Sequence, residues 1–437
     1  MGMERRGCIR KLHLRFNSKE EEILDKTKPF ILSKHIVMQA FQMIKANAGA
    51  AGVDQQSLAD FEMNLKDNLY KIWNRLSSGT YFPPPVKAVP IPKKSGGYRL
   101  LGIPTVADRI AQMVVKLVFE PCIEPHFLSD SYGYRPRKSA LDAVGITRQR
   151  CWQYDWVLEF DIEGLFDNID HELLMKAVDK HTDCKWTKLY IKRWLKTPMQ
   201  LPDGSLQPKT KGVMQGGVIS PVLSNLFLHY VFDSWMTRKF PDVKWCRYAD
   251  DGLVHCKTQY QANQLLAMLT ERFRECGLSL HPDKTKIVYC SKRSRKGDYP
   301  NLEFDFLGYT FRKRLAKRKS DNTIFLNFTP AVGKRSLNAM RDKIRKRRYS
   351  TKTDISIEAI AKEVNPIFRG WINYYGRFNR ECLNPIFRYF YMTLQKWVVH
   401  KFKNWKSKTR AAKFIELIKK QRPNLFVHWY LNGKCFF

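Results

Sequence analysis

Two adjacent carboxylates, Asp250 and Asp251, lie between two short runs of strand-type residues within positions 244–255. The runs and the Asp-Asp-Gly sequence between them are typical of a β-hairpin with a tight turn. Adjacent anions repel each other, so the pair is stable either in water, as an ordinary solvated loop, or on bound cations such as Mg²⁺, which prefers carboxylate oxygens. The hairpin alone does not decide between these two interpretations.

A third carboxylate, Asp161, lies near the carboxyl end of a predicted buried strand at residues 156–162. A charge in that position is costly unless it is paired or holds a metal ion. One carboxylate at a strand end and two more at a later hairpin tip match the needs of a two-metal phosphoryl-transfer site, in which carboxylates hold two Mg²⁺ ions about 4 Å apart. The acids therefore predict this chemistry with two Mg²⁺ ions.

The elements expected around these acids alternate between helices and strands. Thr105 is predicted to cap a helix whose apolar positions follow the 3.6-residue period, and Asp170 or Asn168 to cap the helix after the Asp161 strand. Ser220 as N-cap, with Pro221 at the first helical position, predicts the start of a long helix. The order of elements predicts an α+β sheet domain.

Two glycine-containing segments offer further ligand contacts. Residues 89–104 read as two strands joined by a Gly-Gly turn, with Lys93 and Arg99 near the tip. They form either a clamp for a polyphosphate or an exposed hairpin with ordinary surface cations. Gly216 and Gly217 precede the helix at Ser220, where they allow close backbone approach to a ligand or simply form a turn.

The charge of the chain indicates a polyanionic partner. Its 437 residues include 77 Lys and Arg against 41 Asp and Glu, a formal net charge of +36 and a pI near 9.8. Such an excess favours nucleic acid, because neutralised phosphates release counterions. There is no apolar run of about 18 residues to span a bilayer and no secretory signal, so we expect a cytoplasmic protein. The ten cysteines are scattered singly, which argues against a structural zinc site and a disulfide framework.

The last part of the chain has a different character. From residue 312 onward about 31 Lys and Arg face about 7 Asp and Glu, roughly two thirds of the whole net charge. Residues 304–311 read as a strand that pairs with residues 323–328, and helical patterns follow near 336–346, 355–375, 385–402 and 410–420. The interleaved aromatics suit a nucleic-acid duplex or structured RNA, although such residues also serve as core.

Several motifs, taken together, resemble those of reverse transcriptases. They occur in the family's order and spacing: Phe160-Asp161 with residues 166–169, Gln215-Gly216-Gly217 with Ser220-Pro221, Tyr248-Ala249-Asp250-Asp251, and Phe306-Leu307-Gly308. Within that superfamily the chain resembles group II intron-encoded reverse transcriptases, or maturases, in residues 49–54, 91–104, 131–136 and 365–375. The resemblance runs from about residue 40 to residue 405, most of the chain.

This resemblance implies an α+β right-hand polymerase, with an antiparallel sheet in fingers and palm, followed by an α-helical thumb or maturase domain. The implied parts are a basic N-terminal extension at 1–35, fingers and palm at 36–312, thumb at 313–405 and a short basic DNA-binding segment at 406–437. The expected partners are group II intron RNA, an RNA template with a DNA primer, target DNA and dNTPs, without a membrane; the resemblance leaves the oligomeric state open.

The resemblance also implies roles for the acids. Asp161 and Asp250 would bridge the metals and Asp251 would support them, with Ile162 at both the metal and the nucleotide site. Metal activation of the primer 3′-hydroxyl and in-line attack on the α-phosphate make up the implied chemistry. Lys284 is the implied proton donor to the leaving group, with Lys286 as a near alternative.

Nucleotide-binding roles follow in the same way. Lys93 and Arg99 would grip the triphosphate, and Phe166 would lie under the sugar and exclude a 2′-hydroxyl. Gln215 and Gly216, followed by Gly217, would pack against the nascent base pair.

Two departures from the family pattern limit the expectation. Met214 stands where the family commonly has proline, and the paired cysteines of an HNH endonuclease are missing, so second-strand cleavage is not expected. The implied function is an RNA-directed DNA polymerase that binds its intron RNA, assists splicing and copies the intron during retrohoming in a bacterial cytoplasm or nucleoid. The alternatives are a non-catalytic RNA-binding splicing factor and a domesticated, defence-type reverse transcriptase.

Overall fold

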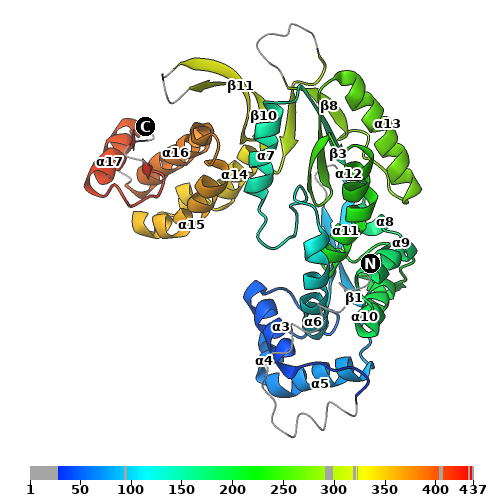
Figure 1. Ribbon diagram of the computed structural model, residues 1–437. Helices are drawn as coiled ribbons and strands as arrows, with labels where there is room; N and C mark the ends of the chain where they lie inside the picture. The colour runs from blue at the N-terminus through cyan, green and yellow to red at the C-terminus, as the bar shows by residue number, and fades with distance from the viewer. Residues whose placement is uncertain are drawn as a thin grey trace. The chain divides into compact units, whose positions relative to one another are not determined.

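The computed structural model describes residues 28–92, 96–290, 299–317, 321, 323–402, 407–431 and 434–435. Lys93 and most of the N-terminal extension expected at 1–35 therefore lie outside the described residues. The chain divides into two compact units. The first comprises Met1–Ser139, Phe160–Leu253 and Asn263–Thr285, and the second comprises Ala140–Glu159, Val254–Ala262 and Lys286–Phe437. The chain combines helices with mainly antiparallel sheets, which agrees with the α+β prediction (Figure 1).

Helices make up most of the first unit. They are α3 (Lys34–Asn47), α4 (Leu58–Met63), α5 (Leu65–Ser78), α6 (Val106–Ile123), η1 (Glu124–His126), α8 (Leu165–Asn168), α9 (His171–His181), α10 (Lys185–Lys196), α11 (Ser220–Leu228), η2 (His229–Asp233), α12 (Ser234–Lys239) and most of α13 (Gln259–Glu275). Thr105 caps α6 by accepting from the Asp108 amide, and Asp170 caps α9 by accepting from the Leu173 amide. Both capping predictions are confirmed.

The helix expected from Ser220 differs from the prediction in two respects. Ile219 is the N-cap, so Ser220 is already the first helical residue and its side chain caps nothing there. The helix also widens into the π-turn η2 before it continues as α12. A π-turn inserts one residue into the helical ladder, and such insertions are frequent at functional sites.

A small sheet in the first unit has the strand order β2-β1-β4-β5, formed by β1 (Val86–Pro92), β2 (Tyr98–Ile103), β4 (Met199–Gln200) and β5 (Leu206–Gln207). The predicted hairpin of β1 and β2 is confirmed, with Arg99 opposite Ile91. β4 joins β1 in parallel, so this sheet is not wholly antiparallel as expected.

A buried carboxylate anchors α6 in this region. Asp108 is fully buried and accepts hydrogen bonds from Tyr81 Oη at 2.9 Å, Trp194 Nε1 at 2.8 Å and Gln112 Nε2 at 2.9 Å. Burial raises the pKa of Asp108, and these three donors oppose that rise. The donors thereby satisfy a group that would otherwise destabilise the core.

A second four-stranded sheet has the order β6-β7-β3-β8, formed by β6 (Lys244–Tyr248), β7 (Asp251–Cys256), β3 (Trp156–Asp161) and β8 (Lys286–Tyr289). β3 and β7 each continue from one unit into the other. In the first unit the ring of Phe160 packs against Phe232 and Phe273, with ring centroids 5.0 and 5.7 Å apart. This packing fixes the end of β3 that carries Asp161.

The hairpin of β6 and β7 is confirmed, but its turn is not where Asp-Asp-Gly predicts it. The turn residues are Ala249 and Asp250, and Asp251 already begins β7. Gly252 lies inside the strand, where an added Cβ would come within 2.0 Å of the Phe160 ring. The glycine therefore serves close packing rather than the turn, and Ala249 adopts the left-handed conformation with φ +57°.

The second unit contains α7 (Ala140–Cys151) and a three-stranded sheet ordered β11-β10-β9, formed by β9 (Glu303–Phe306), β10 (Tyr309–Lys317) and β11 (Ile324–Val332). The single strand predicted at 304–311 is wrong, because Leu307 and Gly308 form a tight turn within it, both with positive φ. The predicted pairing with the following strand is confirmed, and β10 and β11 form a long ribbon (Figure 1).

Helices complete the second unit: α14 (Lys334–Lys346), η3 (Tyr349–Thr351), α15 (Ile357–Tyr375), η4 (Arg380–Leu383), α16 (Asn384–Lys401) and α17 (Lys408–Gln421), followed by the short pair β12 (Tyr430–Leu431) and β13 (Lys434–Cys435). The four long helices match the predicted ones. One apolar core joins them and includes Ile360, Phe390 and Trp397 together with Ile415 and Trp429. Residues beyond 405 thus contribute to the same core as the helices before them.

Candidate active site

Asp161 ends β3, and its backbone is held by the returning chain. Its carbonyl accepts from the His281 amide at 2.8 Å, and Ile162 forms an isolated bridge with Leu280. The Asp161 side chain is 17% exposed, and its Oδ2 accepts from Lys284 Nζ at 2.8 Å. Lys284 is therefore the immediate counter-ion of Asp161.

Asp250 and Asp251 lie close enough to Asp161 for its negative charge to affect their pKa values. Burial raises the pKa of Asp250 and Asp161 adds to the rise, whereas Lys284 and Arg99 lower it. Burial, reinforced by Asp250 and then Asp161, raises the pKa of Asp251 to about 7. The hairpin tip and the strand end thus form one cluster of half-buried carboxylates whose charges repel each other.

This donor set fits a hard divalent cation. Carboxylate oxygens are the ligands that Mg²⁺ prefers, and a cation would offset the burial and the mutual repulsion that together raise the pKa values of Asp250 and Asp251. Within the described ranges, however, no three His, Cys, Asp or Glu side chains are close enough to hold a metal ion as they stand. The ion pair of Asp161 with Lys284 is one contact that a bound cation would have to replace.

The residues expected at the nucleotide site lie on neighbouring backbone segments. Gln215 accepts at its carbonyl from the Gly102 amide at 2.7 Å, and its Nε2 donates to Asp167 at 3.4 Å. Phe166 accepts at its carbonyl from the Val213 amide at 2.6 Å. These bonds connect β2, the turn before α11 and the short helix α8.

Gly216 is a tightly packed point of this arrangement. It has φ +103°, and an added Cβ would lie 2.3 Å from the Gly102 carbonyl oxygen. The side chain of Arg99 is exposed on β2, and its charge acts on Asp250. Lys93 lies outside the described residues, so of the two expected cations only Arg99 can be placed, and the two-cation grip stays a prediction.

Tyr134 was not singled out from the sequence. It is 49% exposed and its backbone is left-handed, with φ +56°. Burial raises its pKa, and Asp250, Tyr248 and Asp251 raise it further, while Arg99 acts in the opposite sense. Tyr134 therefore interacts electrostatically with Asp250, Asp251 and Arg99, and in the sequence only the glycine-containing loop around it pointed to this place.

Comparison with known proteins now bears on this geometry. Residues 91–311, just over half of the chain, match the family model described as reverse transcriptase (RNA-dependent DNA polymerase). The chain belongs to the reverse transcriptase family. Residues 337–415 match the model described as the maturase-specific domain of group II introns, which places the chain among group II intron-encoded reverse transcriptases and maturases. This second match continues past residue 405.

Individual relatives agree with this assignment. The chain is 31% identical over 320 residues to protein YkfC of Escherichia coli K12, covering 62% of this chain and 77% of YkfC. It is 34% identical over 219 residues to the group II intron-encoded protein LtrA of Lactococcus lactis, covering 49% of this chain and 36% of LtrA. It is also 26% identical over 222 residues, 50% of this chain and 26% of the relative, to the putative COX1/OXI3 intron 1 protein of Saccharomyces cerevisiae.

The length and apolarity of the helices bear on whether any of them could span a membrane. In the part of the chain that the structure describes, none is both long and apolar enough to cross a bilayer.

Proposed function

We propose that this protein is an RNA-directed DNA polymerase that binds a group II intron RNA, assists its splicing and copies it into DNA at a new site. The observation that carries the proposal is the cluster of Asp161, Asp250 and Asp251, in which burial and then mutual repulsion raise the pKa values of Asp250 and Asp251 and so favour bound cations. The maturase-specific match at 337–415 supports the intron RNA as the partner. LtrA, described as a group II intron-encoded protein, supports the same assignment.

Asp161 and Asp250 would hold two Mg²⁺ ions, with support from Asp251 and the main-chain carbonyl of Ile162. Bound there, the ions would activate the primer 3′-hydroxyl and neutralise charge on the reacting phosphate and the leaving pyrophosphate. The low exposure of Asp161, 17%, supports this role, because a shielded carboxylate interacts more strongly with a cation than one in bulk water.

Lys284 has two successive tasks in this proposal. Without a cation its Nζ neutralises Asp161 at 2.8 Å. With a cation held at Asp161, Nζ would be free to donate a proton to the departing pyrophosphate oxygen. The side chain is suited to such a movement because it is 56% exposed. Lys286 is the weaker candidate, since its Nζ pairs with Glu159 at 3.3 Å.

The remaining residues would bind and orient the nucleotide. Arg99, with Lys93, would grip the triphosphate, and Phe166 would lie under the sugar and exclude a 2′-hydroxyl. Gln215 and Gly216 would pack against the nascent base pair. Gly216 is held close to β2, since an added Cβ would lie 2.3 Å from the Gly102 carbonyl oxygen.

The proposed parts are fingers and palm at 36–312, a thumb at 313–405, basic segments at 1–35 and 406–437, and a right-hand arrangement overall. The charge of the helical part supports contact with RNA or an RNA–DNA duplex. Because α17 shares the core of α14 to α16, we assign DNA binding to the exposed face of α17 rather than to a separately folded segment.

Primer extension tests the proposal. Wild-type protein with Mg²⁺, a primed RNA template and dNTPs should make cDNA, and Asp250→Ala should abolish extension while RNA binding stays nearly unchanged. Asp203→Ala is the control, because the Asp203 carboxylate is exposed and accepts hydrogen bonds from the amide and hydroxyl of Ser205. A wild-type protein that binds intron RNA and promotes splicing but never extends a primer would instead support the non-catalytic splicing factor.

A further inference from the structure

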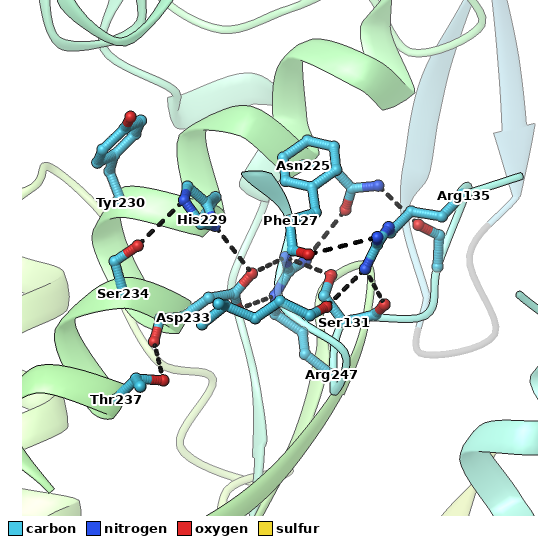
Figure 2. Close-up of polar contacts among 12 residues, drawn as sticks. Phe127, Ser131, Arg135, Asn225, His229, Tyr230, Asp233, Ser234, Thr237 and Arg247 are labelled. Carbon is cyan, nitrogen blue, oxygen red and sulfur yellow. Dashed lines mark hydrogen bonds and ion pairs between the residues drawn. The ribbon is translucent and has the colours of Figure 1, made fainter. Parts of the chain in front are cut away.

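Arg247 precedes the turn that carries Asp250 and has an exposed fraction of 0%. Figure 2 shows its contacts with Asp233, Ser131 and Asn225. A guanidinium group has five N–H donors, and here each has an acceptor. Nε and Nη2 donate to the two carboxylate oxygens of Asp233 at 2.7 and 2.6 Å. Asp233 is also fully buried and ends the π-turn η2.

The other three donors reach separate segments of the first unit. Nη2 donates to Ser131 Oγ at 2.8 Å, and Nη1 donates to Asn225 Oδ1 at 3.1 Å. The last bond runs from Nη1 to the carbonyl oxygen of Ala249, also at 3.1 Å. Arg247 thus connects the turn itself to Asp233 on one side and to Ser131 and Asn225 on the other.

The turn has a conformation that must be held. Ala249 has φ +57°, a region that alanine disfavours because its Cβ approaches the following carbonyl. Gly133 packs so closely on it that an added Cβ would lie 2.4 Å from the Ala249 nitrogen. Asn225 Nδ2 donates to the Gly133 carbonyl at 2.6 Å. Asn225 therefore accepts a hydrogen bond from Arg247 and also holds the Gly133 segment that packs on the turn.

Stability alone is a weak reason for such a pair. Burying two charges is costly, and well-packed apolar residues in place of a buried ion pair often leave a protein equally stable or more stable. What apolar residues cannot reproduce is a rigid fork that binds Asp233 and the Ala249 carbonyl at once. The ion pair of Arg247 and Asp233 therefore contributes mainly by fixing the position of the turn.

We propose that Arg247 and Asp233 are positioning residues for the Asp250 and Asp251 carboxylates, an inference that rests on the polymerase function proposed above. The pair holds the left-handed Ala249 and thereby sets where the hairpin tip lies relative to Asp161. It acts through the turn rather than on substrate.

The test replaces both charges at once, with Arg247→Met/Asp233→Leu, so that neither is left buried without a partner. We expect a melting temperature and RNA affinity close to wild type, an unchanged KM for dNTP, and a kcat about 100-fold lower, the loss typical of a misplacement of ~1 Å. The matched control is Lys116→Met/Glu120→Leu, a pair on α6 with side chains 23% and 22% exposed, which should keep the wild-type kcat.

A second measurement does not depend on catalysis. Hydrogen exchange of the amides in residues 245–253 should be faster in the double variant than in wild type, while the control variant matches wild type. Unchanged exchange, a wild-type kcat, or a double variant that does not fold would each overturn the proposal. If wild-type protein extends no primer, the polymerase function fails, whereas the exchange data still decide whether the pair holds the turn.

Discussion

The hairpin site of the first unit and the helical core of the second unit are stabilised in different ways. At the site, alanine is held in a left-handed turn, an arginine and an aspartate are fully buried, and two half-buried carboxylates have raised pKa values. In the helical core the packing is largely aliphatic and aromatic, with Phe390, Leu394 and Trp397 almost wholly buried. One region holds its charges in place through a polar network, and the other minimises apolar exposure.

Because of this difference, the two regions tolerate different substitutions. In the helical core a side chain matters mainly through its volume and apolar area. At the site a single added methyl group collides with a ring or a backbone atom, as at Gly252 and Gly216. We therefore expect similar substitutions to have opposite consequences in the two regions.

The largest effect is expected for Gly252→Ala. The new Cβ would lie 2.0 Å from the Phe160 ring, which is packed between Phe232 and Phe273 and cannot retreat. We expect a loss of on the order of 3 kcal/mol in the free energy of unfolding, measured by urea denaturation. A variant as stable as wild type would show that the hairpin site is no more tightly packed than the helical core.

A smaller effect concerns His428, which lies among the aromatic rings of the helical core. His428 is buried against Phe387 and Phe426, and burial lowers its pKa to about 3. Because the unfolded chain binds the proton near pH 6.5, His428 costs stability on acidification from pH 7 to pH 5, by about 2 kcal/mol.

The substitution His428→Phe removes this titration, so between pH 7 and pH 5 the variant should lose about 2 kcal/mol less stability than wild type. The measurement is urea denaturation at both values. Equal losses in wild type and variant would contradict the assignment of a neutral, buried imidazole in this core.

The smallest effect is expected for Gly370→Ala in α15. An added Cβ there meets no atom within 4 Å, and the residue is exposed. Alanine is the better helix former, so we expect a gain of roughly 0.5–1 kcal/mol in unfolding free energy. A loss instead would show that the surface of α15 is more constrained than its contacts indicate.

The same contrast explains what could be predicted from the sequence. The helices expected near 336–346 and 385–402 are confirmed as Lys334–Lys346 and Asn384–Lys401, because apolar periodicity and core packing agree there. The caps at Thr105 and Asp170 were predictable for a similar reason, since a cap acts within one turn of the chain.

The details of the site depend on contacts between distant segments, which no local pattern records. Asp-Asp-Gly predicted a turn that actually lies at Ala249 and Asp250, because Gly252 is required against Phe160. The π-turn that ends at Asp233 and the bond from Arg247 to Ser131, 116 residues apart in sequence, gave no signal in the sequence. The acids themselves were recognised from their order and spacing, whereas the residues that hold them were not.

We expect catalysis to depend on the Asp250 site and nucleic-acid binding to depend in large part on the basic helices. Two variants separate these properties. Asp250→Asn alters the site alone. Replacing the exposed cations of α17 by glutamine (Lys408, Arg410, Lys413 and Lys420) leaves its buried residues Ala411 and Ile415 in place. As a control, glutamine replaces the exposed Lys185, Lys192 and Lys196 of α10. This triple variant is compared with an α17 variant that carries three of the four replacements.

The most direct measurement is the single-turnover primer-extension rate together with the affinity for duplex target DNA, in the same preparations. The proposed function predicts that Asp250→Asn lowers the primer-extension rate at least about 100-fold and leaves the affinity for duplex DNA unchanged. It predicts that the α17 variant weakens DNA binding, with a smaller salt dependence, while extension at saturating template is retained. Loss of both properties together in either variant, or extension that survives Asp250→Asn, would contradict it.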